Sequence, residues 1–285
     1  MPKTLLIANT LSGSGQDSLS GPLKHLRGEI QQLRIDRVDD LPAMIRKEAP
    51  AVEQIVICGG DGTINRALDA LIDAGRPVGL IPTGTANDLA RSLGIPVDPT
   101  QAIAIINSGQ QRSVDIARVN GVSFINALGI GLGPRTTREM DGDEKARFGV
   151  GAYLLGLIRA LRSLPQFSAR IESDSLEREG RYVQITIANG IHYGGGMTVS
   201  ERAHLDDGLL DVLLVKAKSR WRLFFNAIRF KTGVVENSKT LDHWQCRNIK
   251  INTGQELEVT ADGEFLTRTP IECEVVPGAL SLIAP

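Results

Sequence analysis

The chain has 285 residues, a formal net charge of −1 at pH 7 and 42% hydrophobic residues. This length suits two domains with sizeable cores. A charge so close to zero gives no overall field that would attract nucleic acid or an anionic membrane, so we expect no nucleic-acid partner and only local contacts with a membrane surface. The three cysteines stand singly among apolar neighbours, which predicts buried thiols in a reducing compartment.

The predicted location is the cytoplasm. The first residues lead directly into a strand pattern, without the basic and apolar regions of a signal peptide. The longest nearly uncharged apolar stretch, residues 148–158, is far short of the ~20 residues that a transmembrane helix needs. Peripheral association with the inner membrane face stays open.

The first 120 residues alternate strand and helix patterns. Strands are expected at residues 5–8, 54–58, 78–81 and 113–119, and helices at residues 21–33, 41–48, 64–73, 89–93 and 99–108. This alternation predicts βαβ units around a parallel sheet. We therefore expect a Rossmann-like parallel α/β domain over residues 1–120.

A glycine turn, GGDGT at residues 59–63, joins one of these strands to the helix that follows. Glycines without Cβ let backbone N–H groups approach a phosphate, and the helix N-terminus adds free donors and a partial positive charge. The turn therefore predicts a polyphosphate site. Because the Asp61 carboxylate would repel phosphates, it indicates a divalent cation or a water between them, as in Mg-nucleotide chemistry.

A second turn, PTGTAND at residues 82–88, follows the next strand. One glycine turn by itself is often only a turn, but two of them about 20 residues apart favour a site. The carboxyl ends of neighbouring parallel strands form the ligand crevice of such sheets. The polar side chains of both turns are expected to meet there, namely Asp61, Thr63, Thr85, Asn87 and Asp88.

After residue 120, short strand patterns dominate, at residues 121–127, 168–172, 182–188, 209–215, 248–251, 257–260 and 271–276. Turn signals such as Asp207-Gly208 and Asp262-Gly263 separate several of them. This pattern predicts a mainly antiparallel β-sandwich domain with a few helices over residues 121–285, whose last strand could return to the first domain.

Four short motifs occur in order along nearly the whole chain: NTLSG at 9–13, GGDGT at 59–63, PTGTAND at 82–88 and ADGE at 261–264. Together they resemble the diacylglycerol kinase catalytic-domain family, and the GTAND form at 84–88 is most similar to the soluble bacterial lipid kinases. One departure is Thr10, where the family usually has proline. The resemblance implies two lobes with the active site in the cleft between them, and the transfer of the γ-phosphoryl group of ATP, with Mg²⁺, to the hydroxyl of a diacylglycerol-like or related lipid.

The resemblance also implies which residues hold the nucleotide and its cation. Asp61 and Asp88 would organise Mg²⁺ or a water. The full nucleotide-binding set is Asn9, Ser12, Gly59, Gly60, Asp61, Gly62, Thr63, Ile64, Asn65, Gly84, Thr85, Asn87 and Asp88.

The Asp262-Gly263-Glu264 run is expected to carry the chemistry, because the proton acceptor of the family falls in this tripeptide. A lipid hydroxyl that attacks a γ-phosphate must lose its proton, and a carboxylate within hydrogen-bond reach is the usual acceptor. Glu264 is the candidate base, with Asp262 orienting it or binding Mg²⁺, although the two roles could be exchanged. The same run predicts a type I′ hairpin, and a hairpin tip can still present two carboxylates.

A further acidic run surrounds Asp207. Here the resemblance implies a Mg²⁺ bound by the Asp207 side chain and by the backbone carbonyls of His204 and Leu209. Oxygen ligands fit a hard cation. The alternative is an Asp-Gly turn that binds nothing. The four histidines lack metal-ligand spacing, so a zinc site is not expected.

Two stretches have the composition of membrane-contacting helices. Residues 218–231 mix cations with aromatic side chains, including Trp221 and Phe225, and residues 153–164 carry two arginines in an apolar run. Their apolar faces could equally pack on the sandwich, which is the commoner fate of such helices. The GIGLG run at 129–133 lacks the spacing of a dinucleotide fingerprint and favours a close-packed turn.

Two alternatives to a lipid kinase stay open. An NAD kinase shares the GGDGT turn and the two lobes, although the 82–88 run matches the lipid kinases better. A catalytically silent lipid-binding protein is disfavoured by the complete acidic set. No motif identifies the lipid or the oligomeric state.

Overall fold

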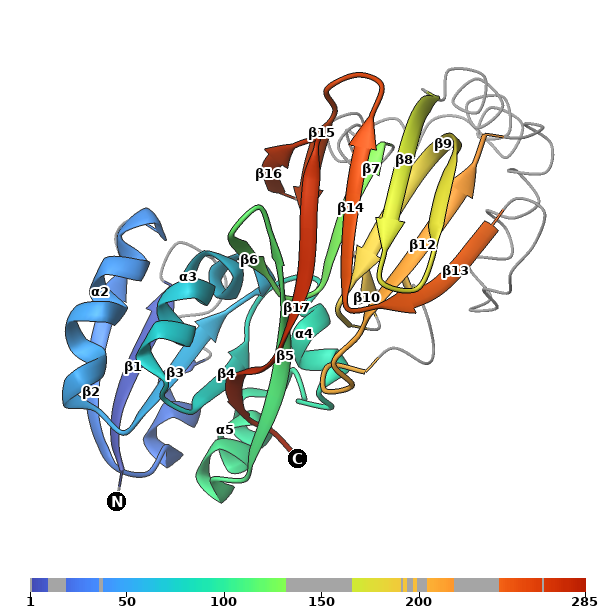
Figure 1. Cartoon of the computed structure of the whole chain (residues 1–285). Coiled ribbons are helices and arrows are strands. Elements are labelled where there is room, and N and C mark those ends of the chain that lie inside the picture. Colours follow the sequence, from blue (N-terminus) through green and yellow to red (C-terminus); the bar gives the residue numbers. More distant parts are fainter. Residues whose placement is uncertain are drawn as a thin grey trace, which may run out of the picture.

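The computed structural model describes residues 2–9, 19–35, 38–131, 166–190, 192–193, 197–198, 204–217, 241–262 and 264–285. In this part of the chain one mixed sheet of 15 strands runs through two units, and a small second sheet pairs β10 (His192–Tyr193) with β11 (Met197–Thr198). Figure 1 shows the described helices packed around one end of the large sheet.

The first unit is built on four parallel strands. Their order is β2 (Glu29–Ile35), β1 (Lys3–Asn9), β3 (Gln54–Gly59) and β4 (Val78–Pro82). Every residue of β3 and β4 is buried, as expected for strands that are covered on both faces. The expected parallel sheet is therefore present.

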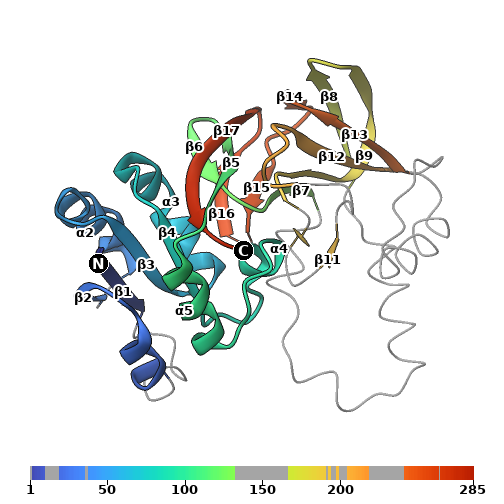
Figure 2. The same ribbon diagram turned by 90° about the horizontal axis from the view of Figure 1, so that it is seen from below.

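Helices cover both faces of this sheet, as Figure 2 shows. The helices α2 (Leu41–Glu48) and α3 (Asp61–Ala74) lie on one face, and α5 (Pro99–Ser108) with the 3₁₀ turn η1 (Pro22–His25) lies on the other. The short elements are η2 (Val38–Asp40), η3 (Ala49–Ala51) and α4 (Asp88–Ser92).

Local sequence explains the bounds of the longer helices. In α3, Ile64, Ala67, Leu68 and Leu71 recur on one face and are buried, and Gly75 ends the helix in the left-handed conformation with a φ of 59°. In α5, the Asp98 side chain accepts a hydrogen bond from the backbone N–H of Gln101. Such caps satisfy the free amides of a first turn.

The second unit consists of antiparallel strands around its own core. In β8, Phe167, Ala169 and Ile171 alternate with exposed or half-buried residues, as a strand with one buried face requires. The strands are β7 (Ala127–Gly131), β8 (Phe167–Ser173), β9 (Glu177–Ala188), β12 (Leu210–Lys216), β13 (Leu241–Cys246), β14 (Asn248–Thr253), β15 (Glu258–Ala261) and β16 (Glu264–Arg268).

Two strands belong to both units. β17 (Ile271–Ile283) pairs with β14 and β5 (Gln111–Val119) in antiparallel fashion and then with β4 in parallel, through Leu282 opposite Val78. Its register shifts between Val276 and Leu280, where Gly278 has a φ of 60°. β6 (Val122–Phe124) pairs with β5. The chain therefore crosses between the units within paired strands (Figure 1).

The expected helix at residues 21–33 is wrong. The structure has η1 followed by β2, and Gly28 between them has a φ of +116°. A Cβ at Gly28 would lie 2.2 Å from the carbonyl oxygen of Pro2, so this close approach is open to glycine alone. The expected strand at 121–127 is likewise divided into β6 and β7.

The GIGLG run begins as part of a strand. Gly129 and Gly131 belong to β7, and a Cβ at Gly131 would lie 2.4 Å from the carbonyl oxygen of Val183 on β9. Close packing of backbones therefore explains Gly131. The three cysteines are buried and free, as expected.

Candidate active site

The two glycine turns pack directly against each other at the carboxyl ends of β3 and β4. A Cβ at Gly60 would lie 2.8 Å from Cα of Gly84, and a Cβ at Gly84 would lie 2.6 Å from Cα of Gly60. The backbone N–H of Thr83 donates to the carbonyl oxygen of Gly59 over 3.1 Å. The fold thus brings together the turns at 59–63 and 82–88, because the parallel strands end at one edge.

The first turn of α3 presents its backbone amides at this edge. The amides of Thr63 and Ile64 donate to the carbonyl oxygen of Gly60 over 3.0 and 3.2 Å. The amides of Asp61 and Gly62 precede them and have no carbonyl behind them within the helix. A 14-residue helix also carries a partial positive charge here, which favours an anion.

Asp61 links the two turns through its carboxylate. Its Oδ2 accepts the amide of Asp88 over 3.0 Å, and its Oδ1 accepts the amide of Leu89 over 3.1 Å. Asp61 therefore caps the first turn of α4, while each oxygen keeps a second lone pair. Its assignment to Mg²⁺ or water stays a prediction.

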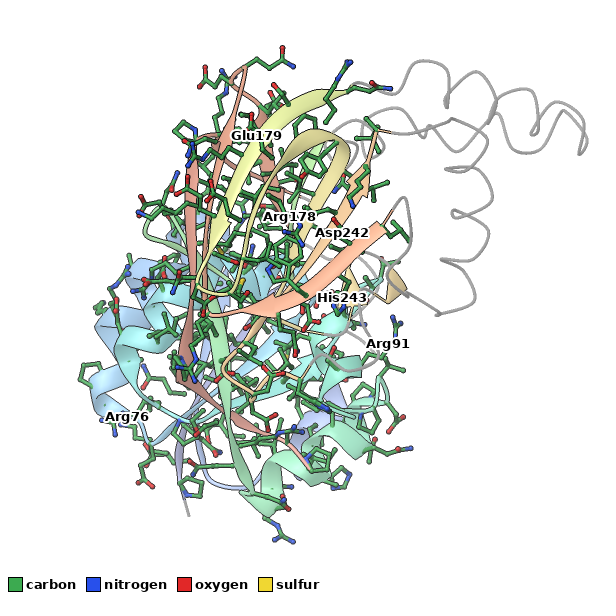
Figure 3. The ribbon with its side chains drawn as sticks, turned by 45° about the vertical axis from the view of Figure 1, so that its right-hand side comes forward. Arg76, Arg91, Arg178, Glu179, Asp242 and His243 are labelled. Atoms are coloured by element: carbon green, nitrogen blue, oxygen red, sulfur yellow. The ribbon has the colours of Figure 1, made fainter. Side chains whose placement is uncertain are left out.

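Asn87 and Asp88 shape the second turn. Asn87 has a φ of 49°, its Oδ1 accepts the amide of Gly84 over 2.9 Å, and its Nδ2 donates to the carbonyl of Gly84 over 2.7 Å. Asp88 is buried, with Oδ1 3.2 Å from Nη1 of Arg91, whose side chain lies at the surface in Figure 3. The side chain of Asn87 therefore stabilises the turn, and that of Asp88 pairs with Arg91 on α4.

The remaining residues predicted to bind the nucleotide differ in whether their side chains and amides are free to contact a ligand. Thr63 packs under Gly59, where a Cβ would lie 2.8 Å from the Thr63 side chain. Ile64 belongs to the core, and its amide already donates to Gly60. Oδ1 of Asn65 is buried without a hydrogen-bond partner among the described residues. Gly84 and Thr85 are exposed.

The first motif is described only in part. Asn9 ends β1 at the same edge, but its side chain lies outside the described residues, as does Ser12.

The expected hairpin joins β15 and β16 at Asp262. Ala261 pairs with Glu264, and Asp262 has a φ of 50°, as a type I′ turn requires. The amide of Asp262 donates to the carbonyl of Ala127, and the amide of Ala127 donates to Oδ1 of Asp262, both over 3.0 Å. Oδ2 is buried and has no hydrogen-bond partner among the described residues.

Burial raises the pKa of Asp262 to about 6. The backbone amides of Ala127, Asn126 and Ile125 partly offset this rise in pKa because they stabilise the charged form, whereas the nearby charge of Asp61 adds to it. The two carboxyl groups, one from each unit, are thus close enough to interact. A carboxylate oxygen that is buried without a protein partner can bind a cation or accept a hydrogen bond from a water molecule.

Glu264 lies over the first turn of α3. Its Oε1 is 3.8 Å from the place that a Cβ at Gly62 would occupy, and its Oε2 accepts a hydrogen bond from Nη2 of Arg66 over 3.2 Å. Arg66 in turn donates from Nη1 to Oδ1 of Asp39 over 2.6 Å. The Glu264 carboxylate of the second unit therefore lies beside the first turn of α3 in the first unit.

Asp207 lies in a second acidic region. Its Oδ1 accepts the amide of Leu209 over 2.9 Å, and Nε2 of Gln245 is 3.5 Å from Oδ2. Burial raises the pKa of Asp207, the amide of Leu209 lowers it, and the charges of Asp211 and Asp115 raise it further. A cation bound here would offset the repulsion between these carboxylates and stabilise the charged form of Asp207.

The neighbours of Asp207 are already engaged. Asp115 accepts the amides of Gly208 and Gly278 over 2.6 and 2.8 Å. Asp211 lies 2.7 Å from Nε2 of His243 on β13 (Figure 3). No group of three or more His, Cys, Asp or Glu side chains within the described ranges could hold a metal. A cation here would therefore need backbone carbonyls, so the set of Asp207, His204 and Leu209 stays a prediction.

Arg66 and Asp115 were missed from the sequence. Arg66 stands four residues after Gly62 and so on the same face of α3, which was a signal that it could reach the site. Asp115 is an acid within an apolar strand, which indicates a buried carboxylate with a structural task.

The predicted membrane stretches, residues 153–164 and 218–231, lie outside the described residues, as do Trp221 and Phe225. Across the described ranges, no helix is both long and apolar enough to cross a membrane.

Two family models match the chain and divide it as the fold does. The diacylglycerol kinase catalytic domain matches residues 3–119, and the YegS C-terminal NAD kinase beta sandwich-like domain matches residues 128–284. The probable lipid kinase YegS-like of Yersinia enterocolitica is 31% identical over 294 residues, which cover 100% of this chain and 98% of that protein.

Solved structures agree with the family models. A Bacillus anthracis protein provisionally assigned as a diacylglycerol kinase has a TM-score of 0.85 and 31% identity, covering 99% of this chain and 95% of that one. A crystal structure of a diacylglycerol kinase from Bacillus anthracis has a TM-score of 0.78 and 27% identity, covering 99% and 97%. The chain therefore belongs to the diacylglycerol kinase catalytic-domain family and, within it, to the YegS-like lipid kinases.

Proposed function

We propose that this protein transfers the γ-phosphoryl group of ATP, with Mg²⁺, to the hydroxyl of a diacylglycerol-like or related lipid. The observation that carries this proposal is the meeting of Asp262 and Glu264 from the second unit with Asp61 and Gly62 at the N-terminus of α3. A phosphate-binding turn and an acceptor of protons then share one site.

The first unit binds the nucleotide phosphates. The amides of Asp61 and Gly62 donate to phosphate oxygens, and the absence of a side chain at Gly62 lets those oxygens come close, while Gly60 lets the two turns pack against each other. Gly62 faces Glu264, so a phosphate bound at this turn lies next to the carboxylate of the second unit.

Glu264 accepts the proton of the lipid hydroxyl. As the hydroxyl oxygen forms its bond to the γ-phosphorus, its O–H bond breaks, the proton moves to Glu264, and the bond from the γ-phosphorus to the β,γ-bridging oxygen breaks with ADP as the leaving group. Asp262 supports this step from the hairpin turn, two residues before the base.

The residues present fit Mg²⁺. Oδ2 of Asp262 is buried without a protein partner, and Asp61 adds a second carboxylate within interaction distance. When bound, Mg²⁺ supplies positive charge that neutralises the phosphates during transfer. Asp88 and Asp207 are further proposed ligands, the latter with the carbonyls of His204 and Leu209.

Access to a lipid implies transient contact with a membrane surface. We assign this contact to residues 218–231, whose basic and aromatic composition suits the interface. The protein would then act as a cytoplasmic enzyme with peripheral membrane association.

The test is incubation of the purified protein with γ-labelled ATP, Mg²⁺ and a total bacterial lipid extract in detergent micelles. We expect label in the organic phase, and mass spectrometry then identifies the phosphorylated lipid. Label that stays in the aqueous phase, as released phosphate or on a nicotinamide nucleotide, would contradict the proposal.

A further inference from the structure

Arg66 connects the proposed base to the nucleotide-binding unit. Its Nη2 lies 3.2 Å from Oε2 of Glu264 on β16, and its Nη1 lies 2.6 Å from Oδ1 of Asp39 in η2. The guanidinium is therefore held between an acid of its own unit and an acid of the other. None of the sequence motifs includes Arg66.

The guanidinium suits this task because it is planar and rigid. Asp39 engages one terminal nitrogen, which fixes the plane, and the other terminal nitrogen is then directed at Glu264. A lysine at this position would offer a single charge on a flexible stem and no fixed direction.

Glu264 needs such support. It begins β16, an edge strand that pairs with β15 in the described sheet, and half of its side chain is exposed. The β15–β16 backbone alone leaves a glutamate several rotamers. With Arg66 in place, Oε2 faces the guanidinium and Oε1 is turned toward Gly62, where the phosphates are proposed to bind.

We propose that Arg66 is a positioning residue that holds Glu264 in the orientation in which it accepts the proton of the lipid hydroxyl. This inference rests on the proposed function, because it takes Glu264 as the base. Arg66 acts through Glu264 and touches neither ATP nor the lipid. Misplacing a reacting group by about 1 Å can cost on the order of 100-fold in rate, so the expected effect is on turnover.

The ion pair between Arg66 and Glu264 contributes little to stability, so substitution of Arg66 should change the rate without unfolding the protein. The exposed fractions of the two side chains are 43% for Arg66 and 50% for Glu264, and ion pairs so exposed to water add little to folding. A matched control is the ion pair between α2 and α3, in which Nη2 of Arg46 on α2 lies 3.1 Å from Oδ2 of Asp73 on α3, with exposed fractions of 50% and 60%.

The experiment compares Arg66→Met, Arg66→Lys and Arg46→Met in the full-length protein, with γ-labelled ATP and a bacterial total lipid extract in detergent micelles. We expect Arg66→Met to lower the maximal rate by roughly 10- to 100-fold and to leave the KM for ATP within about twofold. Arg66→Lys should recover part of the rate. The melting temperature of Arg66→Met should match that of Arg46→Met, whose rate stays at the wild-type level.

A double-variant cycle separates a positioning role from an independent one. In a Glu264→Gln background, adding Arg66→Met should change the residual rate by less than about twofold, because its target is already lost. An equal loss in both backgrounds would overturn the inference, since Arg66 would then act directly on substrate. A wild-type rate for Arg66→Met would overturn it as well.

The two proposals fail in different ways. If Glu264→Gln lowers the rate strongly while Arg66→Met does not, the base assignment stands and the positioning role is wrong. If Glu264→Gln keeps the rate within about threefold of wild type, the base lies elsewhere, and the inference about Arg66 falls with that assignment.

Discussion

Glu264 touches both units but contributes to neither core. Its side chain is half exposed, and it contacts Arg66 and faces the space beside Gly62. Glu264→Gln keeps the size and polarity of the side chain and removes the proton acceptor. We expect turnover to fall by roughly 10²- to 10⁴-fold, with ATP affinity and melting temperature nearly unchanged. Steady-state rates with calorimetry and thermal melts check this, and a rate within about threefold of wild type would move the base elsewhere.

For Asp262, unlike Glu264, we expect substitution to change stability, because burying this carboxyl group costs folding free energy. Its pKa rises from an ordinary value of 3.8 to about 6. Between these values the folded state binds more protons at Asp262 than the unfolded state does, so the contribution of Asp262 to stability is most favourable below about pH 4 and falls as the pH rises toward 6. The fall amounts to roughly 3 kcal/mol of unfolding free energy.

Asp262→Asn removes this titration. We expect the melting temperature of the variant, relative to that of wild type, to rise between pH 4 and pH 8, while turnover is lost throughout. The exposed Asp69 on α3 provides the control Asp69→Asn, whose difference from wild type should not change in this way. A constant difference for Asp262→Asn across this range would contradict the burial of an ionised carboxylate.

At the scale of elements, the contact between the two glycine turns predicts different effects for alanine at Gly60 and at Gly62. A Cβ at Gly60 would meet the backbone of Gly84 at 2.8 Å, whereas a Cβ at Gly62 would find Oε1 of Glu264 at 3.8 Å, an ordinary contact. Gly60→Ala should therefore force the turns apart, lowering both the melting temperature and ATP affinity. Gly62→Ala should keep or raise the melting temperature, because alanine favours a helix over glycine by about 0.5–1 kcal/mol. Equal melting temperatures would show that the turns can separate without cost.

The predictable parts of this fold are those whose signal is local. The glycine turns, the helices around them and the Asp262-Gly263 hairpin follow from short runs, and the structure has each of them. β2 was missed because Leu23, Leu26, Ile30 and Leu33 have helical spacing, while Gly28 against Pro2 is a contact between distant segments. Likewise, Pro277-Gly278 resembles a turn, yet β17 continues through it as a register shift.

The candidate site divides in the same way. Its motif residues were found because glycine, acid and amide residues cluster in the sequence, but Arg66 resembles any solvent-facing arginine of an amphipathic helix. Its partner Glu264 lies 198 positions away, and only the pairing of the two units brings them together. Ile64 shows the converse, since it stands inside a motif but packs into the core.

At the scale of the whole molecule, Asp115 joins the strands that run through both units. The side chain is 3% exposed on β5, and its two carboxylate oxygens accept the amide of Gly278 in the β17 bulge and the amide of Gly208 beside Asp207. Asp115→Ala would leave both amides without their acceptor in a partly buried setting. We expect a loss of about 2–4 kcal/mol in unfolding free energy.

The same connection predicts how the protein unfolds. Because β17 pairs with strands of both units and β5 contributes side chains to both cores, loss of the Asp115 contacts should weaken the two units together. Hydrogen exchange in increasing denaturant measures this through the amides of β3 in the first unit and β9 in the second. Both sets should lose protection at one midpoint in wild type and at one lower midpoint in Asp115→Ala.

The exposed helix cap Asp98 gives the control Asp98→Ala, which should cost about 1 kcal/mol, less than Asp115→Ala. Two separate midpoints in wild type would mean that the shared strands do not couple the units, and the site between them would then rest on contacts such as that of Arg66 with Glu264.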